Sequence, residues 1–148
     1  LGGQAKLYAV EPARKAFNQL VSNSNLKLAG AWNCDAYQLP LEDETADLVF
    51  TSGVLIHIPP DHLAQATAEI VRVAKKYVMF VEYFSHTPTE VPYRGRSGLL
   101  FKRDFGSFYL DTYPALQTVA YGFLWQREFS NFDNLNWWLF RKNRTGDF

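Results

Sequence analysis

Polar residues at the ends of apolar, strand-like stretches are the part of this sequence most able to do chemistry. Glu11 and Asp35 each follow such a stretch, and Ser52 ends a third one. A histidine, His57, comes shortly after Ser52. Ligands of open parallel sheets bind in the crevice at the carboxyl ends of the strands. We therefore expect Glu11, Asp35 and Ser52 to open onto one crevice that suits a nucleotide-like ligand.

The elements that must position these residues alternate between strand and helix. Apolar runs predict strands, and apolar residues at helical spacing predict helices. The predicted elements are a strand at 7–10, a helix at 13–21, and strands at 26–33 and 47–52, then a helix at 60–74 and a strand at 77–83. The last three form a right-handed β-α-β unit. The continuous apolar run of residues 77–81 predicts a strand covered on both faces, so the architecture is a doubly wound α/β sheet.

The second half of the chain is expected to complete the same sheet. A long loop reaches Arg103, a helix is predicted over 104–113, and strands over 118–125 and 136–141 are expected to pair antiparallel. Most aromatic residues lie in this half, and they are expected chiefly to fill the core. We predict one domain over 1–148, with a cofactor-binding part at 7–83 and a substrate-side part at 84–148.

Composition excludes several other classes of protein. The 148 residues are 47% hydrophobic, and 15 basic side chains balance 15 acidic ones. Because the charges balance, the chain has no excess of positive charge that would favour binding to nucleic acid. No apolar run reaches the ~18 residues that span a bilayer. The single Cys34 fits a reducing compartment. We expect a cytoplasmic protein that binds neither nucleic acid nor membrane.

The stretch from Cys34 to Pro60 resembles the middle of a class I S-adenosylmethionine-dependent methyltransferase. A closer similarity, from Leu7 onward, is to the pseudaminic acid biosynthesis-associated methylases. The similarity lies in short sequence motifs at 53–58 (GVLIHI), 82–84 (EYF), 91–95 (VPYRG), 100–105 (LFKRDF) and 121–123 (YGF), and in Trp137. The resemblance implies a Rossmann-like sheet, S-adenosylmethionine as cofactor, and a small acceptor, favoured to be an acidic or nucleotide-linked sugar of surface glycan synthesis.

One part of the family pattern is missing. The superfamily begins with a strand and a Gly-rich loop, but none of the nine glycines forms such a loop. Residues 1–3 correspond to the turn after the first helix, so the sheet is expected to lack its first strand, which in the family lies between the strands at 7–10 and 47–52. The chain is thus expected to be a fragment, and cofactor affinity should depend on the missing loop.

The resemblance also assigns residues to the cofactor. Glu11 matches the acid that binds the ribose hydroxyls, and Asp35 with the Ala36 N–H matches the adenine site. The alternatives are an acidic helix cap for Glu11 and a solvated turn for Asp35. The cofactor-binding set is Glu11, Pro12, Asp35, Ala36, Ser52 and Gly53.

Two residues are candidates for the chemistry itself. His57 is placed where the reactive methyl should point and could take a proton from the acceptor. The alternative, weighed equally, is that it orders its loop. Glu82 ends its strand at the same crevice and could bind an acceptor hydroxyl. No metal site is expected, because His62 and His86 lack ligand spacing with His57.

The loop after Tyr83 is locally basic and is expected to bind the acceptor. Arg94 and Arg103 would hold a carboxylate or phosphate, and Tyr83 and Tyr93 would form a wall. The alternative is a solvated basic loop. For the whole chain, the rival hypothesis is a non-catalytic α/β module that binds a nucleotide or a partner, or an inactive truncated product.

Overall fold

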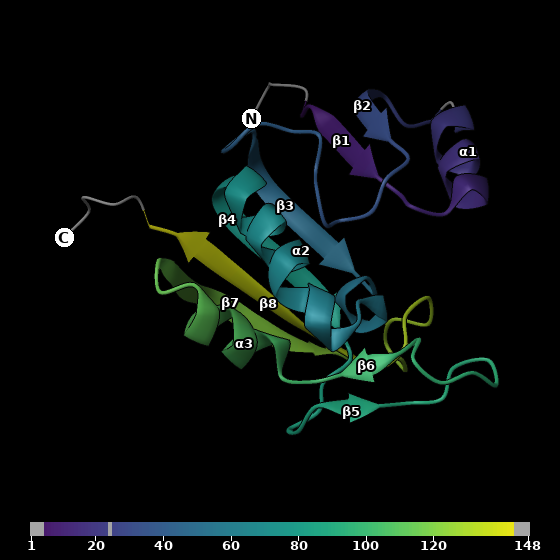
Figure 1. Cartoon of the computed structure of the whole chain (residues 1–148), viewed down its shortest axis with the longest axis vertical. Helices are drawn as coiled ribbons and strands as arrows, with labels where there is room; N and C mark the ends of the chain where they lie inside the picture. Colours follow the sequence, from purple (N-terminus) through teal and green to yellow (C-terminus); the bar gives the residue numbers. More distant parts are fainter. Residues whose placement is uncertain (1–4, 24, 144–148) are drawn as a thin grey trace.

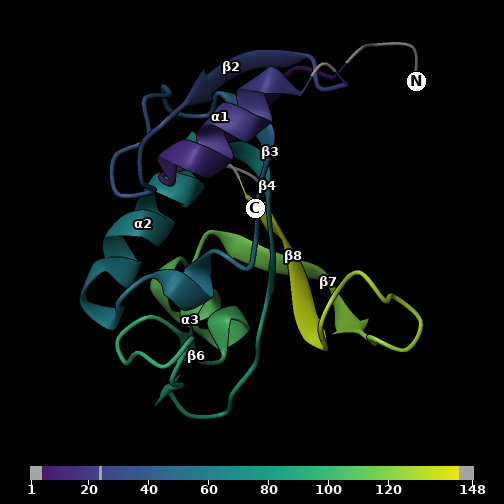
Figure 2. The ribbon, with the colours of Figure 1, turned by 90° about the vertical axis from the view of Figure 1, so that its right-hand side faces the viewer.

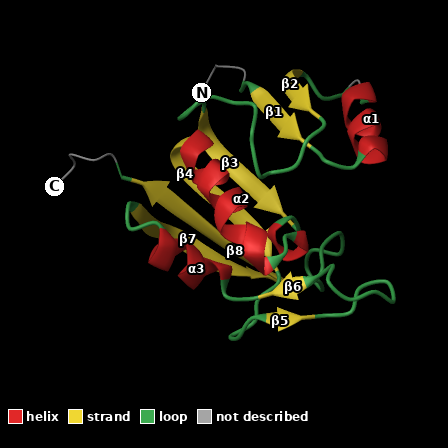
Figure 3. Cartoon of the chain, viewed as in Figure 1, coloured by secondary structure: helices red, strands yellow, loops and turns green. Residues whose placement is uncertain are grey.

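The computed structural model describes residues 5–23 and 25–143, and its elements alternate as the sequence predicts (Figure 1). The strands are β1 (Leu7–Val10), β2 (Leu28–Trp32), β3 (Ala46–Ser52), β4 (Ala74–Glu82), β5 (Thr89–Glu90), β6 (Phe101–Lys102), β7 (Leu116–Leu124) and β8 (Leu135–Lys142). The helices are α1 (Arg14–Ser22), α2 (Pro60–Val73) and α3 (Phe105–Thr112), with a short 3₁₀ helix η1 (Leu55–His57) after β3. Figure 3 shows the same view coloured by secondary structure, with helices red, strands yellow and loops green.

The main sheet is mixed and has the order β3-β4-β8-β7. β3 and β4 run parallel, and β8 pairs antiparallel with both β4 and β7. β1 and β2 form a separate parallel pair. The predicted α/β architecture is confirmed, as is the antiparallel pairing of the last two long strands. β3 and β4 are the strands of the predicted β-α-β unit, with α2 between them.

α2 forms because its sequence supplies both an apolar stripe and suitable ends. Pro60 occupies the first turn, where a missing N–H is tolerated. The stripe is buried, and its members are Leu63, Ala66, Ile70 and Val73. The helix passes directly into β4 at Ala74, three residues before the predicted strand start. The predicted helix over 104–113 is α3, whose N-cap Asp104 accepts a 2.9 Å hydrogen bond from the Ser107 N–H.

One face of the main sheet carries the core. α2 and α3 both lie on this face (Figure 2). Phe80 is fully buried, and its ring lies 4.6 Å from Tyr109 and 5.1 Å from Trp138, measured between centroids. Val78 and Phe140 are also fully buried. Aromatic side chains thus form the core on this face, but the expectation that most aromatics of the second half are core is wrong for Tyr121, Phe123 and Trp125, which are exposed.

The opposite face differs from the expectation. Phe50 is 60% exposed, and Leu48 and Tyr77 are exposed as well. Leu48 pairs with Tyr77 across the β3–β4 ladder, so their side chains share a face. The prediction that the strand at 77–81 is covered on both faces therefore fails at Tyr77 but holds at the other end of the strand, where Val81 is buried. Apolar composition alone does not report which face a helix covers.

β1–β2 and the main sheet are separate sheets. Within the described residues, β1 pairs only with β2, and β3 pairs only with β4. The arrows of β1, β2 and β3 point the same way in Figure 1. The expectation that residues 1–3 form the turn after a first helix falls outside the described residues.

Candidate functional site

The ends of β1 and β2 are tied together by main-chain and side-chain hydrogen bonds. The Glu11 N–H donates to the Trp32 carbonyl at 3.1 Å. The Asn33 side-chain amide donates to the Glu11 carbonyl at 2.8 Å and to the Pro12 carbonyl at 2.9 Å. Asn33 was not predicted as a site residue, although an Asn directly after a strand is a signal for such a turn. Pro12 lies just ahead of α1, which begins at Arg14.

Glu11 and Asp35 use one carboxylate oxygen each for a local turn. Glu11 Oε1 accepts the Ala13 N–H at 2.8 Å, and Asp35 Oδ1 accepts the Tyr37 N–H at 2.9 Å. The turn alternative for Asp35 is therefore present, whereas Glu11 stabilises the turn before α1 and does not cap the helix, whose N-cap is Ala13. Among the described residues no group donates to the second oxygen of either carboxylate. Each side chain can accept a hydrogen bond from a ligand while keeping its turn.

The loop after β2 is held by α2. Arg72 donates to the carbonyls of Leu39 and Leu41 at 3.1 and 2.8 Å, to the Asp43 carboxylate at 2.8 Å, and to Glu69. Glu69 in turn accepts the Leu39 N–H at 2.7 Å. Hydrogen bonding from Arg72 is the main reason that the pKa of Glu69 is lowered. This clamp fixes the segment that leads away from Asp35, and the sequence reading missed it.

The same loop carries Ala36 and Tyr37. Ala36 packs against the core, and the Tyr37 ring stacks on His62 at 5.0 Å. Gln65 donates to the Tyr37 carbonyl at 3.1 Å. Contacts from α2 therefore set the conformation of the loop next to Asp35.

Ser52 and Gly53 lie where β3 gives way to η1. Ser52 is exposed, and Gly53 has a φ of +62°, a left-handed conformation that glycine adopts without strain. The Gly53 N–H donates to the Val81 carbonyl at 2.9 Å. A Cβ at Gly53 would meet no atom within 4 Å, so the space in front of this backbone is open.

Glu82 is placed differently from the expected acceptor contact. Its side chain is 0% exposed. Oε1 accepts the Thr51 hydroxyl and the N–H groups of Val54 and Leu55, and Oε2 accepts the Ile56 N–H. Burial raises the pKa of Glu82 above its usual range, and these hydrogen bonds oppose that rise. The carboxylate is thus occupied by the protein itself.

His57 stands at the exposed end of η1. Its Nδ1 lies 2.6 Å from the Leu99 carbonyl oxygen. A carbonyl can only accept, so Nδ1 carries the proton in this contact, and Nε2 of the neutral ring is left with its lone pair. The ring lies 5.3 Å from that of Tyr93. An imidazole and an aromatic ring are therefore adjacent, and the contact with Leu99 also fits the alternative that His57 orders its loop.

Tyr93 and Arg94 form the tip of a tight hairpin. The Tyr93 N–H donates to the Arg96 carbonyl at 2.9 Å, and the Arg96 N–H donates back at 3.0 Å. Arg94 and Gly95 have φ of +51° and +74°, which is typical of a type I′ turn. The Arg94 guanidinium lies 5.1 Å from the Tyr93 ring centroid. His57, Tyr93 and Arg94 are therefore brought together.

Tyr83 has two charged neighbours. Its hydroxyl donates to the Asp133 carboxylate, which belongs to the β7–β8 loop. This hydrogen bond is the main cause that raises the pKa of Tyr83 to about 12, and Tyr93 contributes to the rise. The Lys102 ammonium lies 4.5 Å from the Tyr83 ring centroid. Sequence reasoning missed Asp133, which lies 50 residues from Tyr83.

Arg103 lies in another environment. Its guanidinium is 4.4 Å from the Phe108 ring centroid, and its Nε is buried with no hydrogen-bond partner among the described residues. Burial lowers the pKa of Arg103. Arg103 also lines a cavity of ≈190 Å³ between η1, α2 and β6, with Leu55, Leu63, Phe101 and Phe105. The structure gives no contact between Arg103 and the Tyr93–Arg94 tip.

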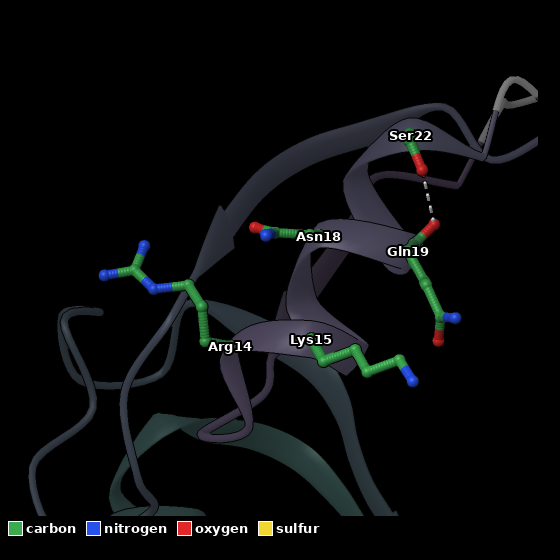
Figure 4. A pocket seen from close by; sticks show the side chains of 5 residues that line it. All are labelled: Arg14, Lys15, Asn18, Gln19 and Ser22. Carbon is green, nitrogen blue, oxygen red and sulfur yellow. Dashed lines mark hydrogen bonds between the residues drawn. The ribbon is translucent and has the colours of Figure 1, made fainter.

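A larger hollow of ≈570 Å³ lies over α1 (Figure 4). It is lined by Arg14, Lys15, Asn18, Gln19 and Ser22. In Figure 4 these side chains project from one helix, and the only hydrogen bond drawn among them runs from Ser22 to the Gln19 carbonyl. None of the strand-end residues lines it. It is the polar outer surface of α1 rather than part of the strand-end site.

Two further properties of the described residues bear on the chemistry. They contain no group of three or more His, Cys, Asp and Glu side chains that could hold a metal ion. None of the helices in the described ranges has the length and apolar character to cross a membrane.

The sequence and the structure were compared with known proteins. Residues 2–81 match the family model described as methyltransferase domain. Comparison with the curated proteins gave no significant match.

Solved structures with the same fold are distant in sequence. An S-adenosylmethionine-dependent methyltransferase from Methanosarcina mazei gives a TM-score of 0.68 at 12% identity, over 92% of this chain and 81% of that one. The PH0226 protein from Pyrococcus horikoshii gives 0.66 at 14% identity, over 93% and 72%. The N-methyltransferase NodS from Bradyrhizobium japonicum, in complex with S-adenosylhomocysteine, gives 0.64 at 13% identity, over 94% and 67%.

Proposed function

The chain belongs to the methyltransferase domain family, and from this premise we propose that it transfers a methyl group from S-adenosylmethionine to a small acceptor, favoured to be an acidic or nucleotide-linked sugar. The observation that carries the proposal is the pair of strand-end carboxylates, Glu11 and Asp35, each with one oxygen not engaged by the described residues. The rival is a module that binds a nucleotide without turnover. Such a module would leave His57 the other role considered for it, which is to order its loop through the contact with the Leu99 carbonyl.

The strand-end residues fit the cofactor by their donor and acceptor chemistry. A free carboxylate oxygen of Glu11 can accept from ribose hydroxyls, and that of Asp35 can accept from the adenine amino group. The open backbone at Gly53 leaves room for close approach. Ser52 adds a hydroxyl, Pro12 shapes the turn beside Glu11, and Ala36 offers its N–H to a ring nitrogen. When bound, the cofactor supplies an electrophilic methyl group.

The reaction requires the acceptor to be aligned and deprotonated. His57 Nε2 would take up the proton that the acceptor's oxygen or nitrogen loses as it is methylated. Most of the rate acceleration comes from alignment, because a held acceptor replaces a bimolecular encounter. The Tyr93 ring beside His57 provides a wall against which an acceptor can lie.

An acidic acceptor is favoured by the cations next to His57. The Arg94 guanidinium lies 5.1 Å from the centroid of the Tyr93 ring, which neighbours His57, and the Lys102 ammonium lies 4.5 Å from that of Tyr83. Guanidinium matches a carboxylate or phosphate in two parallel hydrogen bonds. The resemblance to pseudaminic acid biosynthesis-associated methylases points the same way. Arg103 would act from the neighbouring cavity, on a more distant part of the acceptor.

Calorimetry with S-adenosylhomocysteine tests the cofactor roles. We expect Glu11→Ala and Asp35→Ala each to weaken binding by about 1–3 kcal/mol, since each removes a charge-assisted hydrogen bond. Asp111→Ala, which removes an exposed carboxylate from α3, is the matched control and should bind as the unmodified chain does. Equal dissociation constants for all four proteins would refute the assigned roles.

Kinetics with an acidic sugar nucleotide and its neutral counterpart test the acceptor. Arg94→Lys and Arg103→Lys should each raise the KM of the acidic acceptor severalfold, because an ammonium cannot reproduce the planar fork. Cofactor affinity should stay unchanged in both. Arg14→Lys on α1 serves as a control remote from the strand ends. Equal use of the two acceptors, unaffected by either variant, would leave the basic loop as solvated surface.

A further inference from the structure

Behind the loop that carries His57 lies a buried carboxylate that touches neither the proposed cofactor site nor solvent. Glu82, the last residue of β4, is fully buried, and its partners are Thr51 and three consecutive N–H groups of that loop. We propose that Glu82 is a positioning residue: it gathers the N–H groups of residues 54–56 and thereby fixes η1 and the imidazole of His57. The importance of His57 rests on the proposed function, whereas the positioning does not.

The distances define how the loop is gathered. The Val54 and Leu55 N–H groups each lie 3.1 Å from Oε1, and the Ile56 N–H lies 3.4 Å from Oε2. The first N–H groups of a helical turn have no partner within the turn. Leu55 and Ile56 are buried, so water is not available to them. The two oxygens of a single carboxylate can accept hydrogen bonds from all three of these N–H groups.

The hold on Val54 and Leu55 continues to His57 through the backbone. The Val54 carbonyl accepts the His57 N–H at 3.0 Å, and the Leu55 carbonyl accepts the Ile58 N–H at 3.1 Å. The residues bound by Glu82 are therefore the residues that bind the backbone of His57 and its neighbour. At the other end, the Leu99 carbonyl fixes the imidazole at 2.6 Å. The ring is held from both directions.

The end of β4 holds the start of the same loop as well. The Val81 carbonyl accepts the Gly53 N–H at 2.9 Å. Glu82 itself is anchored by its place in the sheet, where it pairs with Asn136 of β8. Glu82 thus attaches the loop to an interior strand of the sheet. Without these contacts the loop would be held only by its own few hydrogen bonds. A direct contact between Glu82 and the acceptor does not fit a side chain that is 0% exposed.

Glu82→Gln and Glu82→Leu separate positioning from simple support of the fold. In Glu82→Gln, the new side-chain amide keeps one oxygen for the N–H groups of Val54 and Leu55 but turns an NH₂ group toward the Ile56 N–H. The leucine side chain of Glu82→Leu leaves all three N–H groups without an acceptor. The matched control is Asp104→Asn, because the Asp104 carboxylate also accepts a backbone N–H, that of Ser107, at the start of α3.

The measurements are amide hydrogen exchange and the imidazole NMR signals of His57, both without any ligand. In Glu82→Gln, exchange at Ile56 should rise by about tenfold or more relative to core amides such as Val78, as expected for the loss of a satisfied buried donor. The His57 signals should shift at the same time. In Glu82→Leu the increase should extend to Val54 and Leu55. Asp104→Asn should change neither measurement.

Two results would overturn the proposal. One is a folded Glu82→Gln protein with unchanged His57 signals and unchanged exchange at residues 54–56. The other is exchange that rises equally at all core amides, since that marks a general loss of stability. If the Glu82→Leu protein does not fold, the measurements on Glu82→Gln still test the proposal. Failure of S-adenosylhomocysteine to bind would count against the proposed function and leave the positioning result standing.

Discussion

Replacing His57 by Gln is expected to lower kcat by about 100-fold, the lower end of what a positioned general base contributes. The structure leaves Nε2 as the acceptor, because Nδ1 is engaged by the Leu99 carbonyl. A Gln side chain can donate to that carbonyl through its NH₂ group, but it cannot take up a proton. Single-turnover transfer of labelled methyl to an acidic sugar nucleotide measures the effect. Calorimetry with S-adenosylhomocysteine should show unchanged cofactor affinity.

His86→Gln is the control for this prediction. The His86 ring lies 4.9 Å from Phe84 in an edge contact, outside the His57–Tyr93 pair, and its loss should leave turnover unchanged. If His57→Gln turned over at the rate of the unmodified chain, His57 would only order its loop, which is the alternative that its sequence position left open. A fall in cofactor affinity equal to the fall in kcat would also contradict the general-base role.

The order and type of the long elements could be predicted because local signals agree with the tertiary fold. In α2, the apolar spacing, Pro60 at the start and Arg72 in the last turn all indicate one helix, and its stripe is buried. For β3 and β4, apolar runs separated by a helix indicate parallel neighbours. The strand-end position of Glu11 follows from the same logic, because a parallel pair brings its carboxyl ends together.

The burial of individual faces could not be predicted, because it depends on what packs across the sheet. Val78 and Tyr77 are neighbours in one apolar run, yet Val78 is 0% exposed and Tyr77 is 37% exposed. Successive side chains of a strand point to opposite faces, and only one of these faces is covered by α2 and α3 (Figure 2). Composition indicates how much apolar surface a strand has, but not which element packs against each of its faces.

The site could be predicted in part. Residues that follow strands were identified from order alone, whereas the residues that hold them come from other elements. Arg72 reaches the Leu39–Asp43 segment from α2, and Asp133 reaches Tyr83 from the β7–β8 loop. Glu82 was expected at the crevice because it ends a strand. Which way its side chain turns is decided by the N–H groups of η1, and these are not visible in a sequence pattern.

Phe80→Ala is expected to destabilise the protein by about 3–5 kcal/mol, the range for removing a buried aromatic side chain. Phe80 is 0% exposed and lies between the rings of Tyr109, Trp138 and Phe140. Small domains are stable by only about 5–15 kcal/mol, so this loss is a large share of the total. Urea unfolding followed by tryptophan fluorescence should show a lower midpoint with a similar slope.

The matched control is Phe50→Ala, which removes the same side chain from the adjacent strand but on the exposed face. Phe50 is 60% exposed, and it pairs with Met79, next to Phe80, so the two positions differ in face far more than in location. We expect a change within about 0.5 kcal/mol, as for other surface positions. Similar losses at both positions would mean that Phe50 is as well packed as Phe80. The main sheet would then be covered on both faces, as its apolar strands suggest, and the exposed face would have to be reassigned.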